Sequence, residues 1–301
     1  MKRIFTILIS LVLLFSLVAC NSEKTGEAAS SDNTSTIHTH IFAPATCDTP
    51  QTCECGETLG DRLGHMYIDG SCTVCSAVTN EKPKIGNLMV LGDSISTFEG
   101  YTYYEDHHWY MDGGRDDNTT DVTNVRQTYW NILLSNTKGK LVALQASSGS
   151  TICNTVGNGH YVKPNSFISR FENMIKDGFF EKTKVDTLII YGGTNDSNRG
   201  SPIGELKYSD WTEEDLDNFA PAVCYLFDKI KKTLPDTRVI VIVDSTLRYV
   251  VTDALFAASA HYGFETVEIG SEIDMIRPHP TILGMKQIER EIRKVIFPEI
   301  Y

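Results

Sequence analysis

The chain has 301 residues, of which 41% are hydrophobic and 22% are charged, and its formal net charge is -12. This globular composition argues against a wholly disordered chain, a collagen-like repeat and a long coiled coil. The excess of carboxylates disfavours a nucleic-acid partner, because an acidic protein repels phosphate backbones. Five of the eight cysteines fall between Cys47 and Cys75, so the chain is not uniform along its length.

Residues 1–19 are typical of an export signal. Two basic residues precede an apolar run from Ile4 to Ala19, which is shorter than the roughly 20 residues that a membrane-spanning helix needs. The end of the run, LVAC, resembles the signal of bacterial lipoproteins, which implies a lipid anchor on Cys20 and a place at the cell surface. The alternative is a plain signal peptide with an incidental cysteine. Residues 20–37 are polar and are expected to form a disordered tether.

Residues 38–80 are predicted to form a small separate module. They contain few large apolar side chains, so a hydrophobic core alone could not stabilise them. Cys72 and Cys75 form a CxxC motif, and Cys53 and Cys55 are one residue short of a second, at a separation typical of a zinc ribbon. The segment also resembles cysteine-rich repeats in surface proteins of Gram-positive anaerobes. We therefore expect these four cysteines to bind a structural zinc ion. Disulfides are the alternative in an extracytoplasmic compartment, although five cysteines leave one over.

From residue 85 to 301, apolar runs alternate with helical patterns. The runs are rich in β-branched residues and are typical of strands buried on both faces of a parallel sheet; they are residues 86–91, 141–144, 185–191, 239–243 and 266–269. Helical spacing of apolar residues covers 167–175, 212–234 and 285–296. The second of these helices is expected to begin at the capping-box pattern of Thr212 and Asp215, and Pro221 to kink or restart it. The alternation predicts an α/β fold, doubly wound, with a mainly parallel five-stranded sheet and helices on both faces.

Polar blocks follow the predicted strands, and ligands of such sheets bind at the carboxyl ends of the strands. The sequence GDS ends at Ser94 after the first strand, SSG ends at Gly149 after the second, GGTND contains Asn195 after the third, and HP begins at His279 before the last helix. These four blocks in this order resemble the SGNH (GDSL-type) hydrolase family over residues 86–296. The resemblance implies a flavodoxin-like SGNH hydrolase fold and an ester hydrolase that needs no cofactor for catalysis.

The resemblance also implies a role for each block. Ser94 is the expected nucleophile and His279 the general base, because a serine hydroxyl is a weak nucleophile without a base. The backbone N–H groups of Ser94 and Gly149 and the side-chain amide of Asn195 are the expected oxyanion hole, which stabilises the negative charge of the tetrahedral intermediate. Close approach of the backbone to a ligand is the expected reason for glycine at position 149.

The orienting acid is the one departure from the family pattern. The family places an aspartate three residues before the histidine, and here Ile276 stands at that position. Asp274, five residues before His279, is our choice, since an aspartate that bonds the imidazole fixes its tautomer. Glu272, Asp244, or a serine–histidine pair whose imidazole bonds a backbone carbonyl remain alternatives.

A long insertion between the first strand and the next helix, Tyr101–Asp121, is the expected substrate loop. Tyr103, Trp109 and Tyr110 are expected to stack on sugar faces; the alternative is that they pack over the sheet edge. The chain is therefore predicted to be an exported, lipid-anchored esterase that removes short acyl groups, such as acetyl, from carbohydrate or cell-wall substrates. A lipase, lysophospholipase or thioesterase of the same family, and a non-catalytic glycan-binding lipoprotein, are the alternatives.

Overall fold

The computed structural model describes residues 39–63, 67–68, 71–72, 74–75, 83–102, 106–117, 119–276 and 278–298. The predicted signal peptide (1–19), Cys20 with the rest of the tether (20–37), and Tyr103 lie outside the described residues. None of the helices in these ranges combines the length and the apolar character that crossing a bilayer requires.

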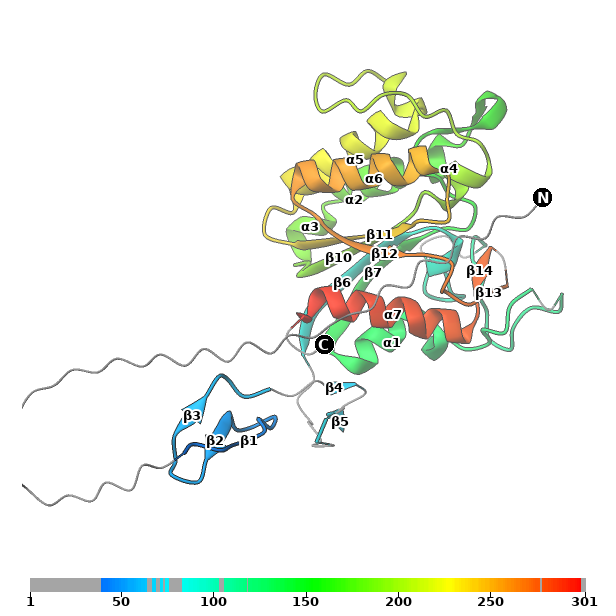
Figure 1. Ribbon diagram of the computed structural model, residues 1–301. Helices are drawn as coiled ribbons and strands as arrows, with labels where there is room; N and C mark the ends of the chain where they lie inside the picture. Colours follow the sequence, from blue (N-terminus) through cyan, green and yellow to red (C-terminus); the bar gives the residue numbers. More distant parts are fainter. Residues whose placement is uncertain are drawn as a thin grey trace, which may run out of the picture.

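A five-stranded parallel sheet forms the centre of the fold (Figure 1). Its strands are β6 (Lys84–Gly92), β7 (Lys138–Ala146), β10 (Thr187–Tyr191), β11 (Arg238–Asp244) and β12 (Glu265–Ile269). Their order is β12-β11-β10-β6-β7, and every neighbouring pair is parallel. The five predicted strands and the doubly wound fold are thus confirmed. The chain reverses direction across the sheet between β6 and β10, and this switch point is where sites form in such folds.

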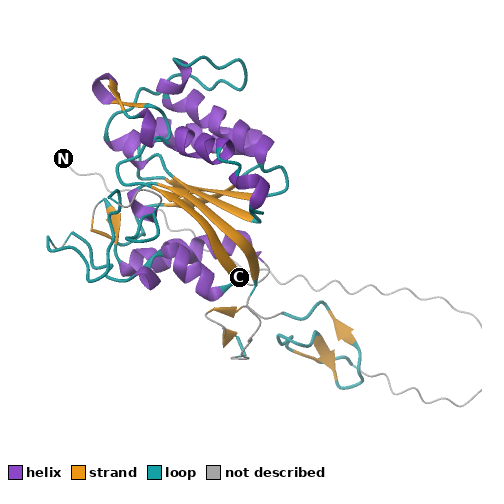
Figure 2. Cartoon of the chain, turned by 180° about the vertical axis from the view of Figure 1, so that it is seen from behind, coloured by secondary structure: helices purple, strands orange, loops and turns teal. Residues whose placement is uncertain are grey.

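Helices cover both faces of the sheet (Figures 1 and 2). One face carries α2 (Phe167–Lys176), α3 (Phe179–Lys182), α5 (Phe219–Thr233) and α6 (Tyr249–Tyr262), and the other carries α1 (Tyr129–Asn136) and α7 (Ile282–Ile296). Side chains of a strand alternate between the two faces. In β10, Leu188 and Ile190 enter one apolar core, while Ile189 and Tyr191 enter the other. Burial on both faces explains why the strands are continuous apolar runs.

Short elements connect the main ones. They are the 3-10 turns η1 (Ser94–Ser96), η2 (Val125–Gln127), η3 (Gly157–Gly159), η4 (Lys163–Asn165) and η5 (Asp215–Asp217), the short helix α4 (Thr194–Asn198), and the hairpins β8 (Thr155–Val156) with β9 (His160–Tyr161) and β13 (Met275–Ile276) with β14 (His279–Pro280). Before the large sheet, β1 (Phe42–Ala43), β2 (Gln51–Cys53) and β3 (Thr58–Leu59) form an antiparallel sheet, and β4 (Tyr67–Ile68) pairs with β5 (Ser71–Cys72).

The predicted start of the helix at Thr212 is wrong. Thr212 and Asp215 do exchange capping hydrogen bonds, of 2.7 and 3.3 Å, but the turn that follows is η5. The helix α5 begins at Phe219, so Pro221 lies in its first turn and the helix continues without a break to Thr233. Backbone N–H groups in a first turn have no partner within the helix, so proline is tolerated there.

Among the helices of eight residues or more, α1 and α6 have no counterpart among the predicted elements. The buried face of α6 includes Val251, Leu255 and Ala258, but outward residues such as Tyr249 and Ala260 are apolar or small as well. The sequence therefore shows little contrast between the two faces of the helix, and that contrast is the signal from which amphipathic helices are predicted.

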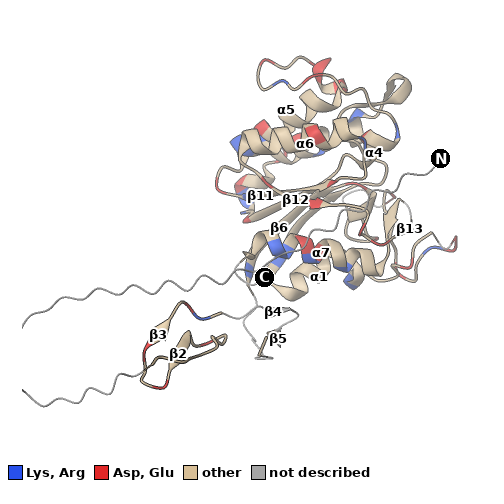
Figure 3. Cartoon of the chain, viewed as in Figure 1, with Lys and Arg blue, Asp and Glu red and all other residues tan. Residues whose placement is uncertain are grey.

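Charged residues lie mostly on the helices and in the loops, where both signs are interspersed (Figure 3). Several form short-range pairs on helices, such as Lys232 with Asp228 at 2.7 Å and Lys294 with Glu291 at 2.9 Å. Exposed pairs of this kind contribute little to stability, on the order of 0.5 kcal/mol each.

Candidate active site

The predicted nucleophile lies at the switch point of the sheet. Ser94 is the first residue of η1, directly after β6 ends, and it is buried except for 8% of its surface. Asp93 caps the turn by accepting a hydrogen bond of 3.0 Å from the Ile95 N–H. The Thr97 hydroxyl donates to the Ser94 carbonyl at 2.7 Å. These bonds fix the backbone that presents the serine hydroxyl.

The structure brings the predicted base to this hydroxyl. His279 lies on β14, in a hairpin in which it pairs with Ile276, and it is 185 residues away from Ser94 in sequence. Its Nε2 is 2.9 Å from Ser94 Oγ. This distance lies within the range for proton transfer between a nucleophile and its general base.

Aromatic rings surround the imidazole of His279. Trp109 stacks on it with ring centroids 3.8 Å apart, and Tyr110 meets it edge-on at 6.1 Å. The Arg115 guanidinium carbon lies 4.4 Å from the centroid of the Trp109 ring. Burial, and to a lesser extent the charge of Arg115, lower the pKa of His279 to about 4. The imidazole is therefore neutral near pH 7 and can accept the serine proton.

The pH dependence of kcat/KM follows from this pKa. We expect an acid limb near pH 4 in the wild type, because only the neutral imidazole is a base. The variant Arg115→Gln removes a positive charge that opposes protonation, so the pKa of His279 rises and the limb moves to higher pH. Arg115→Lys retains the charge and should leave the limb close to its wild-type position, as should Arg126→Gln at an exposed position. Profiles that coincide for all four proteins would contradict this assignment.

Asp274 does not contact the imidazole. Its carboxylate accepts a hydrogen bond from the Thr281 hydroxyl, and its backbone N–H donates to Gln287 at 2.8 Å. Thr281 is in turn the N-cap of α7, accepting from the Gly284 N–H at 3.1 Å. The Nδ1 atom of His279 is buried and has no hydrogen-bond partner among the described residues. The choice of Asp274 as orienting acid is therefore corrected: in this structure it stabilises the start of α7.

The other candidate acids are also bonded elsewhere. Glu272 accepts from the Gly270 N–H at 2.8 Å, and Asp244 accepts from the Thr246 N–H at 2.9 Å. The described residues thus give His279 no carboxylate partner. Ring stacking, rather than a hydrogen bond to Nδ1, holds the imidazole toward Ser94.

The predicted oxyanion hole lies between β7 and α4. Gly149 has a φ of +75°, and a Cβ built there would meet nothing within 4 Å. The left-handed backbone by itself favours glycine at this position, and the open space beside it leaves room for a ligand to approach the backbone. The Asn195 amide donates to the Ser150 carbonyl at 2.9 Å, and Arg199 donates to the Gly149 carbonyl at 2.9 Å. Asn195 keeps a second amide N–H that can be offered to an oxyanion.

Asn195→Ala is expected to lower kcat by about 100- to 1,000-fold, because the loss of one oxyanion donor is felt in the transition state. KM should change little, since the ground-state carbonyl carries less charge. Steady-state kinetics measure both values. Asn198→Ala, at an exposed position of the same short helix, is the matched control. A rise in KM at constant kcat would instead indicate a binding role.

The three predicted substrate aromatics have different positions. Tyr110 is fully buried and its hydroxyl donates to the Pro280 carbonyl at 3.4 Å, so its expected contact with substrate is wrong. Neighbouring residues of an extended segment point to opposite sides, and here the tyrosine faces the core. Trp109 is half-buried and stacks on His279. Tyr103 lies outside the described residues.

The described parts of the insertion are bonded to the segments that contain Ser94, Gly149 and His279. The Trp109 N–H donates to Thr97 Oγ1 at 2.8 Å, beside the nucleophile. The His107 carbonyl accepts from the Ser148 N–H at 2.8 Å. Asp121 accepts from the Ile282 N–H at 2.8 Å, at the start of α7. The insertion is therefore held in place by hydrogen bonds and forms one wall of the site.

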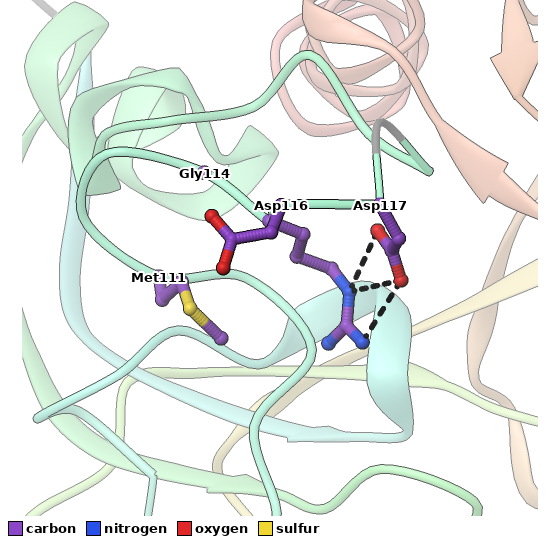
Figure 4. A pocket seen from close by; sticks show the side chains of 5 residues that line it. Met111, Gly114, Asp116 and Asp117 are labelled. Carbon is purple, nitrogen blue, oxygen red and sulfur yellow. Dashed lines mark hydrogen bonds and ion pairs between the residues drawn. The ribbon is translucent and has the colours of Figure 1, made fainter.

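A small pocket of about 270 Å³ lies in this wall, as Figure 4 shows. Its lining residues are Met111, Gly114, Arg115, Asp116 and Asp117. Arg115 donates a hydrogen bond of 3.3 Å to the Asp117 carboxylate. Its guanidinium carbon also lies 4.4 Å from the centroid of the Trp109 ring. The charged lining of the pocket thus contacts the same Trp109 ring that stacks on His279.

The sequence did not predict a role for Arg170, a buried arginine on α2 that contacts the ends of β6 and β7. From α2 it donates to the carbonyls of Gln145 and Gly92, at the ends of β7 and β6, and to Ser150 Oγ at 3.0 Å. It thereby ties the nucleophile strand to the oxyanion loop. The signal was its position: it lies three residues after Phe167, on the apolar face of the helix.

The four predicted zinc ligands do not form one cluster, so the single-site prediction is corrected. Cys53 and Cys55 group with His40, whereas Cys72 and Cys75 group with Cys47. The spacing of the two cysteine pairs suggested a ribbon, but the pairs belong to different small sheets.

Comparisons with known proteins agree on one family. A family model described as GDSL-like lipase/acylhydrolase matches residues 86–296. A crystal structure described as a GDSL-like lipase from Bacteroides ovatus is 34% identical, with a TM-score of 0.64, and the match covers 72% of this chain and 99% of that one. A second, from Bacteroides uniformis, is 33% identical with a TM-score of 0.64, covering 71% and 96%. No functionally curated protein matches.

Proposed function

Because the chain belongs to the GDSL-like lipase/acylhydrolase family, we propose that it is a serine ester hydrolase that works through an acyl-enzyme. The observation that carries this proposal is the 2.9 Å contact between Ser94 Oγ and His279 Nε2. A serine hydroxyl becomes an effective nucleophile when a neutral base accepts its proton. The low pKa of the buried imidazole keeps that base neutral.

In the first half-reaction, Ser94 Oγ attacks the ester carbonyl carbon and His279 Nε2 takes the hydroxyl proton. The N–H groups of Ser94, Gly149 and the Asn195 side chain stabilise the oxyanion. The protonated imidazole then gives its proton to the departing alcohol, which leaves the acyl group on Ser94. Water, deprotonated by the same histidine, releases the acid and restores the enzyme. No step requires a cofactor.

For the substrate, we favour short acyl groups, such as acetyl, on carbohydrate or cell-wall material. The charged lining of the pocket beside Trp109 suits a hydroxyl-rich substrate better than an aliphatic chain. The signal-like residues 1–19 and Cys20 support a protein exported and lipid-anchored at the cell surface, where such polymers lie.

The test is acetate release from acetylated xylan, other acetylated polysaccharides and peptidoglycan, together with p-nitrophenyl esters of increasing chain length. We expect acetyl esters to be cleaved fastest, and the variant Ser94→Ala to release no acetate above background. Equal or faster cleavage of long-chain esters would instead indicate a lipase. Failure of the wild type on every ester would indicate a binding protein.

A further inference from the structure

Cysteines are the buried side chains of the small module that precedes the hydrolase domain. Among residues 39–63, only Cys47 and Cys53 are buried, with 2% and 3% of their surfaces exposed. Large apolar side chains lie outside instead: Ile41 exposes 79% of its surface and Leu63 exposes 62%. A segment with this arrangement has no hydrophobic core to stabilise it, so the stabilising contact must lie at the thiols.

The first thiol group includes a histidine. His40 lies two residues before the start of β1, Cys53 ends β2, and Cys55 lies in the turn before β3. Their ligand atoms all lie within 4.8 Å of one another, and Cys55 Sγ is 3.3 Å from His40 Nδ1. A sulfur and a nitrogen on one tetrahedral zinc ion, with bonds of about 2.3 and 2.0 Å, lie roughly 3.6 Å apart. The three donors therefore need to move only slightly to bind one ion.

A carboxylate next to this group points independently to a metal. Glu57 Oε2 lies 3.0 Å from His40 Nε2, on the far side of the imidazole ring from Cys55. Histidines that bind a metal usually donate their second ring N–H to a carboxylate, which fixes the tautomer. With the proton on Nε2, the lone pair of Nδ1 faces the two thiols.

The second thiol group joins two separate sheets. Cys47 lies in the loop between β1 and β2, whereas Cys72 ends β5 and Cys75 follows it. All three sulfurs lie within 4.8 Å of one another, and those of Cys47 and Cys72 are 3.7 Å apart. A disulfide requires about 2.05 Å. Two thiolates on one tetrahedral zinc ion lie roughly 3.8 Å apart, which agrees with the observed separation.

We propose that the module binds two zinc ions, one through His40, Cys53 and Cys55 and the other through Cys47, Cys72 and Cys75. Thiolate and imidazole donors in tetrahedral arrangement are the set that zinc prefers in structural sites. Each group supplies three of the four donors of a closed structural site, and a further protein donor completes the fourth position. The inference does not depend on the proposed esterase function.

The two ligand sets are interleaved along the chain, because Cys47 lies between His40 and Cys53. The loop closed by the first ion, residues 40–55, contains Cys47, which is a ligand of the second. The loop closed by the second ion, residues 47–75, contains Cys53 and Cys55, which are ligands of the first. The second ion also connects the β1–β2 loop to the β4–β5 hairpin. The metal sites take the place of the missing core, as in other small domains whose folding depends on zinc.

The test is the zinc content of the full chain, purified under reducing conditions and measured by elemental analysis. We expect two zinc ions per chain in the wild type and one in each of Cys55→Ser and Cys72→Ser. The variant Glu57→Gln should weaken the affinity of the first site alone, by about 10- to 100-fold, because it removes the partner of the imidazole. Cys224→Ser and His160→Ala, outside the module, are matched controls that should retain two ions.

Other outcomes would overturn the proposal. One zinc ion in the wild type, lost completely in both Cys55→Ser and Cys72→Ser, would restore a single site of four cysteines. No zinc, with disulfides found by mass spectrometry of the chain purified without reductant, would leave a module stabilised by covalent bonds. Hydrolysis of p-nitrophenyl acetate, measured in parallel, separates either result from a failure of the esterase proposal.

Discussion

Ser94→Ala is expected to lower kcat for p-nitrophenyl acetate by about ten-thousandfold or more. The variant keeps the oxyanion donors and the neutral imidazole, but it has no oxygen to form the acyl-enzyme. In serine hydrolases, loss of the nucleophile removes nearly all catalysis that depends on the serine–histidine pair. Because the Ser94 backbone is fixed by Asp93 and Thr97 rather than by its own hydroxyl, the fold should be preserved.

The comparison requires burst kinetics and a fold control. The wild type should release one equivalent of p-nitrophenol rapidly if deacylation is slow, and Ser94→Ala should show no burst. Ser135→Ala, an exposed serine on α1, should retain wild-type kinetics. If Ser94→Ala kept more than a tenth of the wild-type kcat, Ser94 could not be the nucleophile.

The sheet and the neighbouring positions of Ser94 and Asn195 could be predicted because their signals are local. Strands buried on both faces must be continuously apolar, and each of the five runs became a strand of the central sheet. The blocks with Ser94 and Asn195 follow β6 and β10, which are neighbours in the sheet, so topology alone places them together. His279 comes from the C-terminal hairpin, and only the resemblance to a family linked it to Ser94.

The acid and the aromatic contacts could not be predicted because they depend on competition between neighbours. Asp274 is close enough to His279 in sequence to be its partner, yet the Thr281 hydroxyl binds its carboxylate. Trp109 and Tyr110 are adjacent and chemically alike, but one stacks on the imidazole and the other lies fully in the core. Spacing along a chain limits which groups can meet, and packing decides which of them do.

The same limit applies to the cysteine module. Spacing correctly paired Cys53 with Cys55 and Cys72 with Cys75, since each pair lies within one group of side chains. It could not show that His40 joins the first pair and Cys47 the second. The pairing of β1 with β2 brings His40 to the first pair, whereas Cys47 reaches the second from the β1–β2 loop. Interleaved sets of this kind leave no regular repeat in the sequence.

His279→Ala is expected to lower kcat about as much as Ser94→Ala, again by about ten-thousandfold or more. Without the imidazole, no group accepts the serine proton at the 2.9 Å contact. The double variant should be no slower than either single variant, because the two side chains act as one unit. A double variant that is slower by the product of the two effects would show that they act separately.

Asp274→Asn provides the decisive contrast with His279→Ala. The asparagine carbonyl can still accept the hydrogen bond of the Thr281 hydroxyl, so the start of α7 should be preserved. Where an aspartate orients the catalytic imidazole, its amide variant loses about 10⁴ in kcat through the wrong tautomer. Here the imidazole is held between Trp109 and Ser94, so kcat should stay within about threefold of the wild-type value. A loss above tenfold, with an unchanged thermal midpoint, would return Asp274 to the catalytic unit and imply that the hairpin rearranges when substrate binds.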